Sequence, residues 1–275
     1  MANILIYFIY HAGINSWNET EKINEMEIIW NMAVRNVLII TGGSVDIEWA
    51  KGWLERQKRA GITYDYCIAA DSGLVSADKI GVTVDYMLGD YDSVDEDVLA
   101  KYQGNVPGDR YPAEKDYTDT ELAIKTALDK IKAGNGRNNP EDPGEQSAAL
   151  HASVTVIGAT GTRLDHTLAN IGLLEQIERE GVDGYIVDAH NMIRMLIMPG
   201  KDMVKISSRG QFGGYVSCIA LTPVVHGLTM KGFKYPLDNH DLLQGVSLCV
   251  SNEITDEEGE ISLKEGKMLV LETQD

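Results

Sequence analysis

The sequence predicts a doubly wound α/β domain followed by an all-β sandwich, and two observations support this division. From residue 36 to residue 192, short apolar runs alternate with segments of helical periodicity, as in a parallel sheet covered by helices on both faces. From residue 193 to residue 275, short apolar runs are separated by Gly, Pro, Asn and Asp with no helical period, which is typical of a sandwich or barrel. We therefore expect two domains that divide near residue 192.

Residues 1–35 differ in texture from the sequence that follows them. An apolar heptad at residues 4–10 precedes a polar stretch, and no turn chemistry joins either of them to a neighbour. We interpret the segment as an N-terminal extension, either an added strand and helix or sequence upstream of a biological start at Met32. The heptad lacks the basic flank and the cleavage site of a signal peptide.

Composition and charge exclude several kinds of partner and site. Of the 275 residues, 44% are hydrophobic and 24% are charged, so a globular chain with a core is expected. The net charge of −18 would repel nucleic acids and anionic lipids, and we expect neither as a partner. Cys67, Cys218 and Cys249 are far apart and form no CxxC motif, which argues against a disulfide framework and for a reducing cytoplasm. No run approaches the roughly 20 apolar residues of a membrane-spanning helix.

The first predicted strand of the α/β domain, residues 37–40, is apolar throughout. This is expected of a parallel strand that is buried on both faces. The strand is followed by Gly42 and Gly43 and then by a predicted helix. Glycines at such a turn allow backbone N–H groups to approach a phosphate, although many of them serve only to make the turn.

Aspartates follow two later strands of the same predicted sheet. Residues 66–70 form a strand that ends at Asp71, and the next strand ends at Gly89 and delivers Asp90 and Asp92. Ligands of open α/β sheets bind at the carboxyl ends of the strands, and closely spaced carboxylates suit Mg²⁺. The alternative for the second segment is an acidic turn without a metal.

Two further segments place polar residues at the start of a helix. Thr118 and Glu121 have the spacing of a capping box, and the helix dipole alone would favour Asp116 and Asp119. A helix start does not require the neighbouring Lys115. After the helix that these residues begin, residues 134–152 are rich in Gly, Asn, Pro, Glu and Ser, and we expect a surface loop there.

The strand at residues 154–157 leads into the second of these segments. Gly161 and Arg163 lie between this strand and a helix, where they form a plausible polyphosphate cradle. His166 is either catalytic or a histidine that bonds locally at the helix start. A strand at residues 185–188 closes the domain.

The second domain is predicted from its apolar runs alone. These runs cover residues 194–198, 203–206, 215–221, 228–230, 246–250, 261–263 and 268–271. Each is short and bounded by turn residues, as in antiparallel sheets.

Taken in order, short motifs along the chain resemble the thiamine pyrophosphokinase family, also called thiamin diphosphokinase. The motifs are Ile-Ile-Thr-Gly-Gly (39–43), Ala-Asp-Ser-Gly (70–73), Gly-Asp-Tyr-Asp-Ser (89–93), Lys-Asp-Tyr-Thr-Asp (115–119), Gly-Thr-Arg-Leu-Asp-His (161–166), Gly-Phe-Lys-Tyr-Pro-Leu (232–237) and Ser-Asn-Glu (251–253). Each motif is weak alone, and their shared order over residues 36–275 makes the resemblance specific.

The resemblance implies a Rossmann-like α/β domain that binds ATP, followed by a β-sandwich that binds thiamine. It implies a reaction in which ATP and thiamine give thiamine diphosphate and AMP. It also implies a homodimer, with thiamine bound between the α/β domain of one subunit and the β domain of the other.

The resemblance further assigns roles to residues. It implies Mg²⁺ ligands at Asp90, Asp92 and Asp119, and catalytic positions at Asp71, Lys115, Asp116, Arg163 and Asp165. Within the second set, Lys115 and Arg163 would neutralise charge on the triphosphate, while Asp71 or Asp165 would orient or deprotonate the thiamine hydroxyl.

The remaining implied positions bind the substrates. They are Gly42, Gly43, Thr118, Gly161 and His166 for ATP, and Tyr235, Ser251 and Asn252 for thiamine. Tyr235 stands where some members have tryptophan, which suggests an aromatic face against the cationic rings. Thr162 stands where many members have glycine, and residues 1–35 and 134–152 have no counterpart in the pattern.

Two other interpretations stay open on the residues alone. One is another Mg²⁺-dependent phosphoryl or nucleotidyl transferase that acts on a different small alcohol, for which Tyr235 and Ser251 would be irrelevant. The other is a non-catalytic thiamine-binding relative with a decayed site. The retained Asp71, Asp90 and Asp92 argue against the second interpretation.

Overall fold

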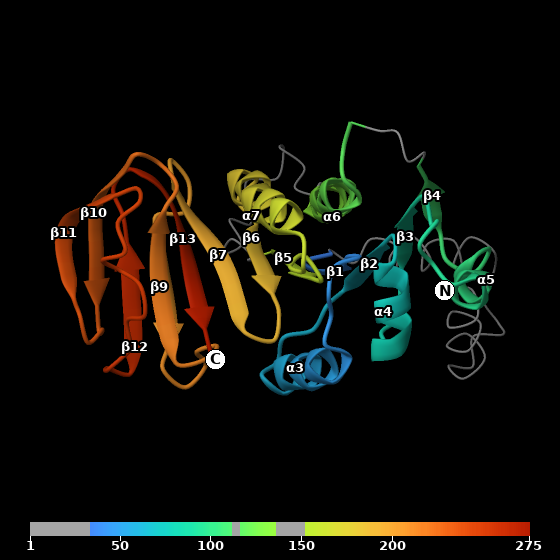
Figure 1. Ribbon diagram of the computed structural model, residues 1–275, viewed down its shortest axis with the longest axis horizontal. Helices are drawn as coiled ribbons and strands as arrows, with labels where there is room; N and C mark the ends of the chain where they lie inside the picture. The colour runs from blue at the N-terminus through green and yellow to red at the C-terminus, as the bar shows by residue number, and fades with distance from the viewer. Residues whose placement is uncertain (1–33, 112–115, 136–151) are drawn as a thin grey trace, which may run out of the picture.

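The computed structural model describes residues 34–111, 116–135 and 152–275 (Figure 1). Residues 1–33 of the predicted extension and most of the predicted loop at residues 134–152 lie outside these ranges, and helix α6 continues to Asn135. Within the described ranges, no helix combines the length and the apolar character needed to cross a membrane.

The described chain forms two sheets. One has nine strands in the order β4-β3-β2-β1-β5-β6-β7-β13-β9, and the other has four in the order β11-β10-β12-β8. The first part of the chain contains β1 (Asn36–Ile40), α3 (Ile47–Arg59), β2 (Tyr66–Ala70), α4 (Gly73–Ile80), β3 (Tyr86–Gly89), α5 (Glu96–Tyr102), β4 (Gly108–Arg110), α6 (Asp119–Asn135), β5 (Ser153–Ile157), α7 (Leu164–Arg179) and β6 (Asp183–Val187). The second part contains β7 (Asn191–Met198), β8 (Met203–Ser207), β9 (Tyr215–Ala220), β10 (Val224–Lys231), β11 (Leu237–Leu243), β12 (Glu258–Ser262) and β13 (Gly266–Thr273).

Strand β1 lies at the centre of the parallel part of the sheet. It pairs in parallel with β2 on one side and with β5 on the other. Its side chains alternate between two cores, with Val37 and Ile39 under α6 and α7, and Leu38 and Ile40 against α3 and α4 (Figure 1). Burial on both faces explains why this strand is apolar at every position.

The order of the strands creates a switch point between β1 and β5. From β1 the chain adds β2, β3 and β4 in one direction, and it then returns to add β5 and β6 in the other. The connections that leave β1 and β5 therefore run to opposite faces of the sheet, which opens a crevice at their carboxyl ends.

The second part of the chain is a sandwich that shares its sheet with the first part. Strands β7, β13 and β9 continue the nine-stranded sheet with antiparallel pairing. Ile193 and Met195 face the α/β core, whereas Leu196 and Met268 face the core that the four-stranded sheet covers. The predicted fold class, an α/β domain followed by a β-sandwich, is confirmed. The predicted division at residue 192 falls inside β7. Strand β7 pairs with β6 and contributes side chains to both cores, so the two parts of the chain share this strand.

One predicted strand of the second half is wrong, and several elements of the chain were not predicted. Residues 246–250 form turns, and their apolar side chains Val246, Leu248 and Val250 are exposed. Strand β11 was not predicted because its sequence is mostly polar and exposed. Strand β4, which is exposed at every position, and the short helix α5 were missed for similar reasons.

A buried group of charges lies where α7 meets the shared sheet. Arg194 on β7 is paired with Glu272 on β13, and Glu272 also accepts a hydrogen bond from the Phe212 N–H at 2.8 Å. Glu178 on α7 is 4% exposed and accepts a hydrogen bond from the Gly184 N–H at 3.0 Å. Burial raises the pKa of Glu178 to about 7, against the opposing charge of Lys201.

This pKa predicts how stability depends on pH. Because ionised Glu178 is disfavoured in the folded state, its burial destabilises the protein increasingly as pH rises from 4.5, the ordinary pKa of a glutamate, to about 7. Glu178→Gln keeps an acceptor for Gly184 and removes the charge. We expect it to raise the free energy of unfolding by on the order of 1–3 kcal/mol at pH 8 and by much less at pH 5.

Urea unfolding at the two pH values measures this difference. Glu180→Gln is the control, because Glu180 lies in an exposed ion pair with Lys132 and surface pairs contribute at most about 1 kcal/mol. An effect of Glu178→Gln that does not change with pH would contradict the assignment.

Candidate active site

A cavity of about 410 Å³ opens at the switch point. It is lined by the turns that follow β1 and β5 and by the first residues of α6 and α7. The two turns are joined by backbone bonds, from the Gly43 N–H to the Gly158 carbonyl at 2.9 Å and from the Ser44 N–H to the Thr160 carbonyl at 3.1 Å. The crevice that the strand order predicts is therefore present as a defined pocket.

Gly43 is required by the close approach of these turns. A Cβ atom at Gly43 would lie 2.1 Å from the Gly158 carbonyl oxygen, a distance that no side chain permits. Because its N–H already bonds to Gly158, Gly43 does not offer that group to a phosphate. Gly42, Gly161, Arg163 and the other predicted ATP-contacting residues Thr118 and His166 all line the cavity.

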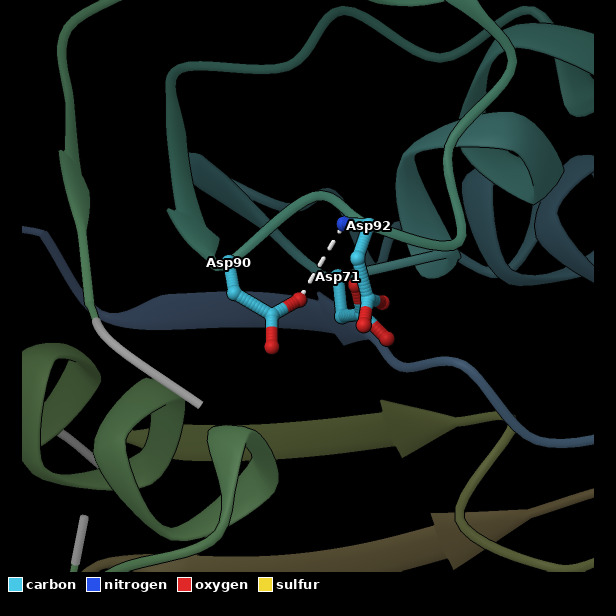
Figure 2. Close-up of side chains that lie close together, drawn as sticks. All are labelled: Asp71, Asp90 and Asp92. Carbon is cyan, nitrogen blue, oxygen red and sulfur yellow. Dashed lines mark hydrogen bonds between the residues drawn. The ribbon is translucent and has the colours of Figure 1, made fainter. Parts of the chain in front are cut away.

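Three carboxylates gather beside this cavity. Asp71 follows β2, and Asp90 and Asp92 follow β3 (Figure 2). One oxygen from each lies within 4.8 Å of the others. The strands are parallel neighbours with Ala70 opposite Leu88, so both end at the same height and direct the aspartates to one edge.

The backbone around these aspartates is shaped for their convergence. The Asp71 N–H donates to the Leu88 carbonyl at 2.8 Å. Asp71 has a φ of 50°, in the left-handed region that non-glycine residues seldom adopt. A Cβ at Gly89 would lie 3.0 Å from the Asp71 Cα, so glycine allows the two strand ends to meet. The Asp92 N–H donates to the Asp90 carboxylate at 3.1 Å and closes the turn.

The electrostatics of the group favour a cation. Burial raises the pKa of Asp71, and the negative charges of Asp119, Asp90 and Asp92 raise it further, against the hydrogen bond from the Ser72 backbone. The Asp71 Oδ1 atom is buried and has no hydrogen-bond partner among the described residues. A buried carboxylate oxygen without a donor is costly, whereas hard cations such as Mg²⁺ and Ca²⁺ bind this kind of oxygen set. The residues therefore fit a divalent metal ion.

This group differs in membership from the predicted metal ligands. Asp90 and Asp92 were predicted together with Asp119, whereas the compact group contains Asp71, which was predicted to be catalytic. Asp119 is the first residue of α6, lines the cavity and is close enough to raise the pKa of Asp71. All four carboxylates thus belong to one acidic region.

Arg163 and Asp165 form a pair at the rim of the cavity. The guanidinium donates from Nε to Asp165 Oδ1 at 3.2 Å and from Nη2 to Oδ2 at 2.6 Å. The bond to Arg163 holds the pKa of Asp165 at about 2. Arg163 lines the cavity and Asp165 does not, so the carboxylate orients the arginine.

The start of α6 is as the capping pattern predicts. The Glu121 N–H donates to Thr118 Oγ1 at 3.2 Å, which confirms the cap. Asp116 is exposed and does not line the cavity. Lys115 lies outside the described residues.

The predicted thiamine-contacting residues lie in the sandwich, and none of the three lines the cavity. Tyr235 is 63% exposed in the connection between β10 and β11. Asn252 is buried, where its amide accepts from the Tyr235 N–H at 3.1 Å and donates to the Tyr235 carbonyl at 2.8 Å. Asn252 therefore holds the backbone of Tyr235. Ser251 is exposed, with a φ of 58°.

Among the lining residues that were not predicted, Asn170 and Thr160 make hydrogen bonds that shape the cavity. Asn170 on α7 is buried and donates to the Ala159 carbonyl at 2.8 Å, and Thr160 donates to Asp188 at 2.8 Å. Both fix the turn after β5. A polar residue in line with Leu174 and Ile177 on the buried face of α7 was the available signal for Asn170.

Comparisons with known proteins agree for both halves of the chain. Family models match residues 60–186, described as "Thiamin pyrophosphokinase, catalytic domain", and residues 203–268, described as "Thiamin pyrophosphokinase, vitamin B1 binding domain". Thiamine pyrophosphokinase of Bacillus subtilis (strain 168) is 31% identical over 209 residues, which cover 76% of this chain and 87% of that protein.

Solved structures are similar as well. The crystal structure of thiamine pyrophosphokinase from Bacillus subtilis has a TM-score of 0.69 and 27% identity, with 88% of this chain and 100% of that chain covered. A thiamin pyrophosphokinase family protein from Enterococcus faecalis has a TM-score of 0.66 and 28% identity, with 88% and 99% covered. Thiamin pyrophosphokinase from Candida albicans, at 18% identity and a TM-score of 0.64 over 90% of this chain and 91% of that one, shares the fold. The chain belongs to the thiamine pyrophosphokinase family.

Proposed function

We propose that this protein transfers the diphosphoryl group of ATP to the hydroxyl of thiamine, which gives thiamine diphosphate and AMP. The observation that carries the proposal is the convergence of Asp71, Asp90 and Asp92 beside the cavity at the switch point. Free thiols at Cys67 and Cys218 are consistent with a cytoplasmic setting.

In this proposal, ATP lies in the cavity with its phosphates toward the acidic group. Asp71, Asp90 and Asp92 would hold Mg²⁺, with Asp119 adjacent to them. The metal ion, when bound, neutralises charge on the phosphate oxygens that develops during transfer. Arg163, oriented by Asp165, approaches the same phosphates from the rim of the cavity.

The same geometry separates the two candidates for a base. Asp165 has a low pKa because it is bonded to Arg163, so it is a poor proton acceptor at neutral pH. Asp71 belongs to the carboxylate group that would hold the metal ion against the phosphates. We therefore assign Asp165 to positioning and Asp71 to the reacting centre.

Thiamine would stack on Tyr235 in the sandwich. Its exposed ring offers an aromatic face to a cationic ligand, and Asn252 fixes the backbone that carries it. The β10–β11 end of the sandwich lies at the opposite end of the molecule from β2 and β3 (Figure 1). One chain therefore does not bring Tyr235 to its own acidic group.

A homodimer with shared sites resolves this separation. Exposed apolar side chains on β9 and in the turns after β11 offer a surface for a second copy of the chain to cover. These side chains are Tyr215, Ile219, Val246, Leu248 and Val250. We expect sedimentation equilibrium at micromolar concentration to give the mass of two chains. The mass of a single chain at that concentration would contradict the shared site.

The reaction itself is tested by its products. With thiamine, ATP and Mg²⁺, we expect AMP and thiamine diphosphate to form in equal amounts. Release of ADP would instead indicate transfer of a single phosphoryl group.

Asp92→Asn removes a charge from an exposed position, so we expect it to fold normally and to lose at least about a hundredfold in turnover. Near wild-type activity in that variant would contradict the metal assignment.

The role of Tyr235 is tested by comparing the two substrates. Cation–π contacts contribute about 0.5–2 kcal/mol, so we expect Tyr235→Ala to raise the KM for thiamine by roughly 3- to 30-fold. The KM for ATP should change little. Tyr235→Phe keeps the ring and serves as the matched control, with a KM for thiamine near that of the wild type. Equal effects of Tyr235→Ala on both substrates would argue against an aromatic platform.

A further inference from the structure

Tyr91 stands between the two aspartates of the β3 turn, but its environment is opposite to theirs. Its side chain is only 8% exposed and belongs to the core cluster that contains Met87 and Val94, whereas Asp92 is exposed. Its φ of 60° lies in the left-handed region. A bulky side chain seldom adopts this conformation unless surrounding contacts impose it.

The hydroxyl of Tyr91 supplies one of these contacts. It donates to the backbone carbonyl of Asp109 at 3.2 Å. Asp109 is the central residue of β4, a three-residue edge strand that is exposed throughout. An edge strand of this length has few ladder bonds of its own, so its position depends on additional contacts.

Asp109 is fixed from its side chain as well. The Tyr86 hydroxyl donates to Asp109 Oδ2 at 2.6 Å, and the Tyr111 hydroxyl donates to the same atom at 3.2 Å. The Tyr111 N–H also donates to the Gly89 carbonyl at 3.0 Å, at the start of the aspartate turn. The side chains of Tyr86 and Tyr91 therefore tie β3 and its turn to β4 through Asp109, and Tyr91 is the one that belongs to the turn itself.

This arrangement matters because the carboxylates repel one another. With oxygens of Asp71, Asp90 and Asp92 within 4.8 Å, an unconstrained turn would relax by moving Asp90 and Asp92 away from Asp71. A turn anchored by a buried ring keeps the ligand set in place before a cation arrives, and such preorganisation increases affinity.

We propose that Tyr91 is the positioning residue of the divalent-cation site, where its buried ring and its bond to Asp109 hold Asp90 and Asp92 toward Asp71. The proposal rests on the Mg²⁺-dependent function proposed above. Tyr91 neither lines the cavity nor belongs to the carboxylate group, and it acts through the two aspartates beside it in the chain.

The test measures Mn²⁺ binding to the full chain without nucleotide. The electron paramagnetic resonance signal of free Mn²⁺ reports how much of the ion remains unbound. Tyr91→Phe keeps the buried ring and removes the hydroxyl. Because one neutral hydrogen bond is lost, we expect the Kd for Mn²⁺ to rise about three- to tenfold. Tyr64→Phe is the matched control, since it also removes a bonded hydroxyl, the one that donates to Thr155 Oγ1 at 3.3 Å, but away from the aspartates. Its Kd should equal that of the wild type.

A second readout separates positioning from general damage. In turnover assays, Tyr91→Phe should require a several-fold higher Mg²⁺ concentration for half-maximal rate, with a smaller change in kcat at saturating Mg²⁺. Tyr86→Phe loosens Asp109 from its other side and should raise the Kd for Mn²⁺ in the same direction by less.

The outcomes are distinguishable. An unchanged Kd in Tyr91→Phe would overturn the proposal while leaving the metal site intact. A reduced kcat at every Mg²⁺ concentration, with an unchanged Kd, would show a merely structural role and would also overturn it. If the wild type bound no Mn²⁺, the metal assignment and this proposal would both fail.

Discussion

The close approach of three carboxylates is the constraint on which the rest of this structure depends. Asp71, Asp90 and Asp92 have oxygens within 4.8 Å of one another, and in the part of the chain that the structure describes, one Asp71 oxygen is buried without a donor. Such an arrangement is unfavourable by itself because the charges repel and burial penalises them. It becomes favourable once a divalent cation neutralises the charge, so the site is built for a ligand that completes it.

The fold supplies the rigidity that this arrangement needs. Two parallel strands in fixed register set the height of the aspartates, and a glycine at residue 89 lets the strand ends touch. The switch point between β1 and β5 places the cavity beside them. The same sheet then continues through β7 into the sandwich, where the buried pair of Arg194 and Glu272 joins β7 to β13. The aromatic ligand platform that we propose lies on the four-stranded sheet, which packs against this continuation through a shared core.

Much of this organisation was predictable because it follows from strong local patterns. The strands that carry the site are apolar on both faces, so β1 and β2 were located within a residue of their observed ends. The glycine and aspartate residues that directly follow the strands then indicated where the site lies. In a sheet of parallel strands that alternate with helices, the carboxyl ends of all strands lie at the same edge. Asp71 and Asp90, which follow successive strands, were therefore expected to lie close together.

The rest depended on contacts that pattern does not encode. β4 and β11 have polar, exposed sequences and exist because neighbours pair with them. The amide of Asn252, a predicted thiamine-contacting residue, bonds to the backbone of Tyr235, 17 positions away, and no local pattern in the sequence indicates this contact. Likewise, Gly43 looked like a phosphate-binding glycine, whereas its place is set by a carbonyl more than a hundred residues away, at Gly158. Tertiary partners, which a single sequence does not name, decide such cases.

The most direct test of the central claim is the position of a bound cation. Crystals of the protein soaked with Mn²⁺ would give an anomalous difference signal at each metal site. We predict a peak coordinated by carboxylate oxygens of Asp71, Asp90 and Asp92. A Mn²⁺ peak that none of these three residues coordinates, with their carboxylates still clustered, would contradict the account.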